Sequence, residues 1–456
     1  MRTRSWRVHV PEPNTDLKRL VRETGWTQRQ FAAQVNRIGT ERGTPKRYSG
    51  PTVHQWIKGH MPREEARPLI LEALSRRLGR PITHADAGFP TLTSEDSNAR
   101  PGISTVEGLI DLGRHDVDPS RRSVIGASLF SVALTVPDWP DVVGRMEAAQ
   151  TSGTARMGMP EVHMVAAMTE RISELDDQFG GRHARPMAAA FMVNTVAQYL
   201  KADAPESVRK AMMSAASDLC YLTGYMAVDE GLHSLAQQYY LKALELAGAA
   251  EDHITYCTTL RGMSVQAVDL GHGLTAMRLA DAAATASPAA GPRMRAFMAG
   301  QQAHAAAQTG DRTRALALLT EAEKATEKAE SRARTFGSYG ASDVAYHASQ
   351  VQYELGDIKG SIASLEESQR LRPSIYRRGR IRHGATMAER QLRMGHLEAA
   401  CATWHGALSE FPLIQSGRAD QRIRTMFALL RPYRKNPAAR ELYERARTVA
   451  PNLCVA

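Results

Sequence analysis

The stretch that decides the fold is AHAAAQTGDRTRALALLTEAEKA, residues 303–325. An Ala-rich run leads to Gly310, and a second run rich in Ala and Leu follows it. Such residues favour α-helix, and a glycine between two helical runs is typical of a helix end followed by a tight turn. The sequence therefore predicts a hairpin of two helices here.

Four further segments have the same form, residues 225–247, 265–286, 351–371 and 389–411. The five turn glycines are Gly231, Gly271, Gly310, Gly356 and Gly395, and they are separated by 40, 39, 46 and 39 residues. Each hairpin is too small to bury its own apolar face, so it must stack on its neighbours. This near-constant spacing predicts an all-α protein whose larger part is an α-solenoid.

The composition of the 456-residue chain suits a mostly helical protein, with 43% apolar and 6% aromatic residues. It contains no apolar run of about 18 residues, and no apolar core follows the basic N-terminus. We therefore expect a cytoplasmic protein with no membrane partner. The four Cys form no CxxC pair and lie near no His at zinc-ligand spacing, so we expect no metal site and no cofactor.

The excess positive charge is concentrated near the N-terminus. Residues 1–90 hold 17 Lys and Arg against 8 Asp and Glu, whereas the remaining residues hold 41 against 40. Local positive charge attracts polyanions through the release of counterions. A nucleic-acid partner and a merely solvated basic surface are both consistent with this distribution.

Residues 14–88 read as short helices, and two of them carry clear start signals. Thr27 is a predicted N-cap with Gln30 three residues later, and Trp26 and Phe31 have the spacing of a hydrophobic staple. The second such helix lies in YSGPTVHQWIKG, residues 48–59, where Ser49 or Gly50 caps, Pro51 lies in the first turn and Gly59 ends the helix. Its apolar side consists of Val53, Trp56 and Ile57.

These signals divide the chain into three parts. Residues 1–88 form the first domain, residues 89–120, rich in Gly, Pro, Ser and Asp, form a linker, and residues 121–456 form the solenoid. The run RRSVIGASLFSVALTVP, residues 121–137, has the twin Arg of an export signal, but it is internal and its apolar part is short. We expect a buried helix there.

The order of capped helix, connection and second short helix over residues 14–80 resembles the lambda-repressor-like, or Xre-class, helix-turn-helix. The resemblance implies that the second helix enters the major groove of an operator in double-stranded DNA. The candidate base-reading residues are Ser49, Gly50, Thr52 and Gln55, and the candidate backbone contacts are Gln28, Arg29, Lys46, Arg47, Lys58 and Arg63. The connection, residues 36–49, is longer than is usual in that class, so either the first helix runs on or a basic wing is inserted.

The solenoid is similar to the tetratricopeptide-type sensor domains that follow such modules in Gram-positive bacteria. The whole chain looks most like actinobacterial regulators of development and antibiotic production. This resemblance implies a homodimer whose repeats bind a signalling peptide, a small molecule or a partner protein. Candidate ligand contacts are Asn194 in an apolar helix and Arg377, Arg378 and Arg380 in an Arg-rich stretch. A helix–helix hydrogen bond and a solvated basic surface are the respective alternatives.

The sequence predicts a sequence-specific DNA-binding transcriptional regulator. It contains no GxxxxGK[ST], HExxH or GxSxG pattern, and its 15 His are dispersed, so we expect no enzyme. One alternative is a protein-interaction scaffold with weak, non-specific DNA binding. A second is an enzyme whose site is assembled from residues far apart in the sequence.

Overall fold

The computed structural model describes residues 13–41, 46–78, 82, 86–89, 105–117, 156–286, 291–329 and 339–454. The chain divides into two compact units, one with the described residues up to 89 and the other with those from 105 onward. In this described part the fold is all-α, with a single isolated bridge between Arg156 and Asp203 and no strand. No described helix is long and apolar enough to cross a membrane.

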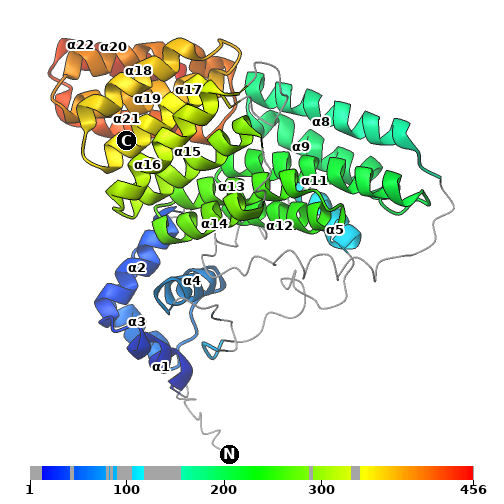
Figure 1. Cartoon of the computed structure of the whole chain (residues 1–456). Coiled ribbons are helices and arrows are strands. Elements are labelled where there is room, and N and C mark those ends of the chain that lie inside the picture. The colour runs from blue at the N-terminus through cyan, green and yellow to red at the C-terminus, as the bar shows by residue number, and fades with distance from the viewer. Residues whose placement is uncertain are drawn as a thin grey trace, which may run out of the picture. The chain divides into compact units, whose positions relative to one another are not determined.

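The N-terminal unit is a small bundle of four α-helices around one apolar core (Figure 1). The helices are α1 (Thr15–Glu23), α2 (Gln28–Glu41), α3 (Gly50–Ile57) and α4 (Arg67–Leu78), with a 3₁₀ turn at Glu64–Ala66. Each helix contributes fully buried side chains to the core, among them Leu20, Phe31, Val53 and Leu74. Burial of the apolar side of each helix fixes the orientation of that helix about its own axis.

The predicted start signals of α2 and α3 are confirmed. Gln30 accepts from the Thr27 backbone N at 2.9 Å, and the Gln30 backbone N donates to the Thr27 hydroxyl at 3.2 Å. The Trp26 ring lies 6.3 Å from that of Phe31. Ser49 is the N-cap of α3, and its end is formed by Gly59, whose φ of 99° favours glycine.

The connection between α2 and α3 is shortened because α2 runs on to Glu41. Of the two predicted explanations for the long connection, the extended helix therefore holds. Residues 42–45 lie outside the described part of the chain. The Asn36 side chain closes this connection, because it donates to the Tyr48 carbonyl at 2.8 Å and accepts from the Tyr48 backbone N at 2.7 Å.

The C-terminal unit contains all five predicted hairpins. They are α11–α12 (Glu206–Asp229, His233–Ala249), α13–α14 (His253–Asp269, Gly273–Ala286), α15–α16 (Pro292–Gln308, Arg312–Glu327), α17–α18 (Ala341–Glu354, Ile358–Leu371) and α19–α20 (Arg377–Arg393, Leu397–Glu410). Each predicted turn glycine lies between the two helices of its hairpin, and all five have φ between 75° and 89°. Consecutive hairpins stack on one another as a solenoid (Figure 1).

Further helices extend this stack at both ends. They are α5 (Thr105–Val117), α8 (Met159–Phe179), α9 (Gly181–Phe191) with a π-helical segment (Met192–Val196) and α10 (Ala197–Tyr199), and then α21 (Gly417–Leu430) and α22 (Pro437–Val449). Helix α5 corrects the predicted linker at residues 89–120, because Leu109 and Leu112 are buried and the helix packs on α9 and α12. The buried helix predicted at residues 121–137 lies outside the described residues.

The solenoid also makes contacts between segments far apart in the chain. The Gln415 backbone N donates to the Phe179 carbonyl at 2.7 Å, and the Arg182 guanidinium binds Glu230 at 2.7 Å and Asp420 at 2.8 Å. Gly180, with φ 92°, lets the backbone at Gln415 approach, because a Cβ there would overlap the Gln415 carbonyl. We call these contacts between residues 179–182 and 415–420 the closing seam.

Candidate functional sites

The exposed side of α3 is the first candidate site. Val53, Trp56 and Ile57 hold its other side in the core. Gln55 is exposed, and its side chain has no hydrogen-bond partner among the described residues. Ser49 is also exposed, but half-buried Thr52 is engaged locally, because its hydroxyl accepts from the Ser49 backbone N at 3.3 Å. Among the described residues, the Gln55 amide is therefore a free polar group on this side of α3.

The start of α2 lies against the start of α3. A Cβ at Gly50 would meet the Arg29 backbone N at 3.5 Å, so the two N-termini are in contact. Arg29 is exposed there, while Gln28 is half-buried. Two helix N-termini and an exposed guanidinium give this side of the unit donors suited to phosphate oxygens.

The other candidate contacts to the DNA backbone differ in how exposed their side chains are and in whether they already form an ion pair. Arg47, Lys58 and Arg63 are exposed. Lys46 forms an ion pair with Glu65 at 3.2 Å, and its side chain is only 21% exposed. Its charge is thus already partly neutralised within the unit, which the sequence pattern did not indicate.

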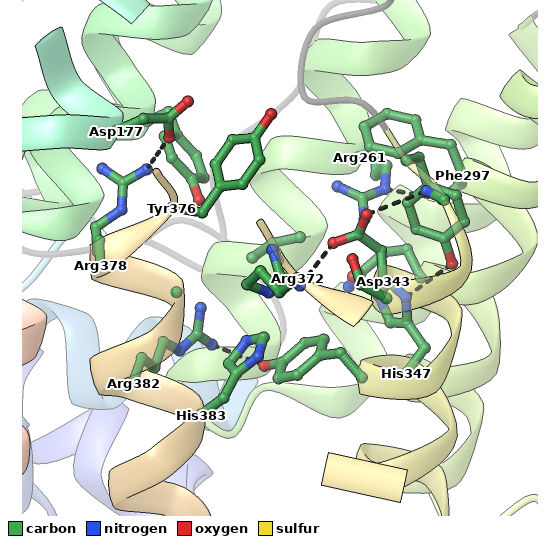
Figure 2. A pocket seen from close by; sticks show the side chains of 18 of the residues that line it. Asp177, Arg261, Phe297, Asp343, His347, Arg372, Tyr376, Arg378, Arg382 and His383 are labelled. Atoms are coloured by element: carbon green, nitrogen blue, oxygen red, sulfur yellow. Dashed lines mark hydrogen bonds and ion pairs between the residues drawn. The ribbon is translucent and has the colours of Figure 1, made fainter. Parts of the chain in front are cut away.

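A second candidate site is a cavity of about 480 Å³ in the C-terminal unit. Residues of α8, α11, α13, α15, α17, α19 and α21 line it. The pocket therefore lies along the first helix of each of the five hairpins. Arg378, Arg382 and His383 project from α19, and Arg261 and Phe297 come from α13 and α15 (Figure 2). We call it the central pocket. Its volume lies within the usual range of about 300–1,000 Å³ for small-molecule sites.

Ion pairs dominate the electrostatics of the central pocket. Among the described residues, five Arg and four Asp line it. Four of these Arg form ion pairs. Arg372 binds Asp343 at 2.9 Å, and Arg378 binds Asp176 at 2.5 Å. Arg382, at 3.0 Å, and Arg418 both bind Asp269. Burial raises the pKa of Asp269, but the guanidiniums of Arg418 and Arg382 outweigh it and hold that pKa below its ordinary value.

The remaining carboxylate, Asp177, is held less firmly. Burial raises its pKa to about 6, although the Arg378 guanidinium lies 3.6 Å away and opposes the shift. With a pKa of about 6, the Asp177 carboxyl group changes its protonation state only slightly below neutral pH, whereas Asp269 stays ionised there.

Three histidines line the central pocket without adding charge. Burial lowers the pKa of His304 to about 4, and it lowers the pKa of His347 and His383 well below the ordinary value. His383 is stacked on Tyr346 with ring centroids 4.3 Å apart, and the His347 Nδ1 lies 2.9 Å from the Tyr339 hydroxyl. At pH 7 the positive charge of the described lining residues is therefore carried by arginine alone.

The predicted ligand contacts fall in different places. Arg378 lines the central pocket. Arg377 is half-buried and does not line it, and Arg380 pairs with Glu410 at 2.7 Å across the α19–α20 hairpin. Asn194 also lies away from the central pocket. This residue is exposed in the π-helical segment, beside a separate cavity of about 360 Å³ lined also by Arg114 and Gln198.

Several residues of the two sites were missed by sequence reasoning. Asn36 positions the start of α3, and Arg261, Phe297 and Asp343 line the central pocket. The Arg-rich stretch that singled out Arg378 also contains Arg382, so that signal was available. Arg261 and Phe297 belong to different hairpins, and no local pattern joins them.

Comparisons with known proteins give limited matches. Residues 17–90 match the family described as SP15 N-terminal domain. No curated protein matches the chain. One similar solved structure is described as the crystal structure of Rap protein complexed with competence and sporulation factor. It is 14% identical, with a TM-score of 0.34, and the match covers 64% of this chain and 99% of that chain.

Proposed function

We propose that the chain is a cytoplasmic, sequence-specific DNA-binding transcriptional regulator. In this proposal α3 reads an operator, and the C-terminal unit binds a regulatory peptide, small molecule or protein and mediates a homodimer. The observation that carries the proposal is Gln55, an exposed amide with no hydrogen-bond partner among the described residues, on a helix whose opposite side is fixed in a core.

The chemistry of the α3 side matches base recognition. A glutamine amide offers a donor and an acceptor in one plane, which fits the N6 and N7 edge of adenine in the major groove. The neighbouring exposed cations, Arg29, Arg47, Lys58 and Arg63, supply the charge that phosphates require. The clustering of net positive charge in the first 90 residues supports the same reading.

The C-terminal unit would supply the regulation. Half-sites of a dimeric operator lie about one helical turn, roughly 34–36 Å, apart. A ligand that changes the packing around the central pocket would change the distance between the two α3 helices and hence the affinity for the operator.

The test is a fluorescence-anisotropy titration of the full chain against genomic promoter fragments, with random DNA as competitor, at two salt concentrations. Gln55→Ala should lose roughly 1–3 kcal/mol on the selected fragment and keep its affinity for random DNA. Lys58→Ala should instead weaken both and reduce the salt dependence. Gln421→Ala, an exposed glutamine on α21, is the matched control and should bind like the wild type.

The result that would overturn the proposal is equal binding of all fragments by wild type and Gln55→Ala, with the same loss of affinity as salt increases. The N-terminal unit would then be an electrostatic patch only. The alternative, a protein-interaction scaffold, would take its place, and its partner would be sought by co-purification.

A further inference from the structure

One arginine of the central pocket lacks the partner that the other four have. Arg261 forms no ion pair with any described residue, and its two terminal nitrogens have no hydrogen-bond partner there. Its Nε donates to the Phe297 carbonyl at 2.8 Å. The free edge of the guanidinium is therefore the one formed by the two terminal nitrogens.

The Arg261 side chain is nevertheless held in one orientation. Its guanidinium carbon lies 3.6 Å from the centre of the Phe297 ring, and that ring packs edge-on against Tyr339 at 5.5 Å (Figure 2). The hydrogen bond and the ring contact together fix the plane of the guanidinium. A fixed planar fork loses less entropy when it binds a planar anion than a mobile lysine would.

The surroundings make this unpaired charge costly. Burial lowers the pKa of Arg261. The carboxylate whose charge opposes that shift, Asp343, is already bound by Arg372 and by the Gly340 backbone N at 3.1 Å. Removing a charge from water is unfavourable unless an opposite charge compensates it. The two terminal nitrogens of half-buried Arg261 therefore present to the pocket a positive charge that no described carboxylate pairs with.

We propose that Arg261 binds a carboxylate of the regulatory ligand, as a two-bond pair through its terminal nitrogens. Bidentate pairing is the preferred geometry of a guanidinium with a carboxylate. Because Phe297, Tyr221 and Tyr225 also line this part of the pocket, the group next to the carboxylate is apolar. The ligand class is thus a carboxylic acid with an apolar neighbour, either the C-terminus of a short peptide or a small organic acid.

This inference rests on the proposed function, since it names the ligand of the regulatory unit. Its test uses the full chain and two pools of N-acetylated random tripeptides that lack Asp and Glu. One pool ends in a free carboxylate and the other in a carboxamide. N-acetyl-phenylalanine and its amide form a third arm that separates a small acid from a peptide. Bound molecules are measured by ultrafiltration and mass spectrometry.

Wild type should retain acids at least tenfold better than the matching amides. Arg261→Gln should lose that preference, and Arg261→Lys should keep a weaker one because it retains the charge but not the fork. Arg278→Gln removes an exposed arginine of α14 and should behave like the wild type. Thermal melts followed by circular dichroism establish that each variant is folded.

Three outcomes would overturn the inference: no preference for acids in any arm, an unchanged preference in folded Arg261→Gln, or displacement of the acid by millimolar inorganic phosphate. The same samples are titrated with promoter DNA. Selective DNA binding without acid preference refutes the carboxylate site alone, whereas acid preference without selective DNA binding refutes the regulator and leaves the site standing.

Discussion

Arg378 joins α19 to α8 through buried charges, and Arg378→Met should destabilise the C-terminal unit strongly. Its guanidinium lies 2.5 Å from Asp176, 3.6 Å from Asp177 and 3.9 Å from Asp229, and both Arg378 and Asp176 are buried. Methionine keeps the side-chain length but leaves these carboxylates without a cation. Removing one partner of a buried ion pair costs about 3–5 kcal/mol.

The loss should depend on pH. Burial raises the pKa of Asp176, and the Arg378 guanidinium opposes that shift. Without the guanidinium the folded-state pKa of Asp176 rises further above its unfolded value. The protonated carboxyl then favours the folded state at low pH, and this contribution is lost as the pH rises through the folded-state pKa. The deficit of Arg378→Met against wild type should therefore be larger at pH 8 than at pH 5.

Urea denaturation followed by circular dichroism measures the effect. With an m value near 3 kcal/mol/M, the midpoint should fall by about 1–1.7 M. The control is Arg171→Gln, which breaks an exposed ion pair to Glu174 within α8 and should leave the midpoint unchanged. A midpoint of Arg378→Met equal to that of wild type at pH 8 would refute the reasoning, because the buried charges would then need no cation.

Three further predictions concern the same unit, and urea denaturation measures all of them. Gly300→Ala places a Cβ against the Tyr339 hydroxyl in the pocket wall, so it should cost about 1–3 kcal/mol; an unchanged midpoint would contradict this. Gly310→Ala, at φ 85°, should destabilise by about 1–2 kcal/mol, whereas Gly406→Ala, inside α20 with open space around its Cβ, should stabilise by about 0.5–1 kcal/mol. A shift of the urea midpoint in the same direction for both variants would contradict this prediction. Asp177, with its pKa raised to about 6, stabilises the fold below about pH 4 and loses that contribution as the pH rises through 6. Asp177→Asn should therefore show a smaller fall of the midpoint between pH 4 and pH 7 than wild type, and an equal fall would count against the assignment.

The architecture was predictable because its signals are local. A glycine with positive φ ends the first helix of each hairpin, so five turns could be placed from single residues. The start of α2 was fixed by Thr27 and Gln30, which lie three positions apart. Helix α5 was missed because the residues around it are rich in Gly, Pro and Ser, while its burial against α9 and α12 is a tertiary effect.

The sites were only partly predictable because they depend on contacts between distant segments. The exposure of Gln55 followed from the apolar spacing of α3 alone. The pairing of Lys46 with Glu65 and the exposure of Asn194 depend on how the neighbouring helices pack. Arg261 differs from the other pocket arginines because no described carboxylate forms an ion pair with it, and that depends on residues more than 70 positions away, such as Asp343, which pairs with Arg372 instead.

The closing seam restricts how this protein can vary. In an open solenoid each repeat touches only its neighbours, so a repeat can be gained or lost without disturbing the others. Here Gln415 must meet Phe179, and Asp420 must meet Arg182. One hairpin more or fewer would carry residues 415–420 away from residues 179–182 and break both contacts. The number of hairpins between α9 and α21 is therefore fixed by geometry, and length variation among related chains is expected outside this interval or in the turns within it.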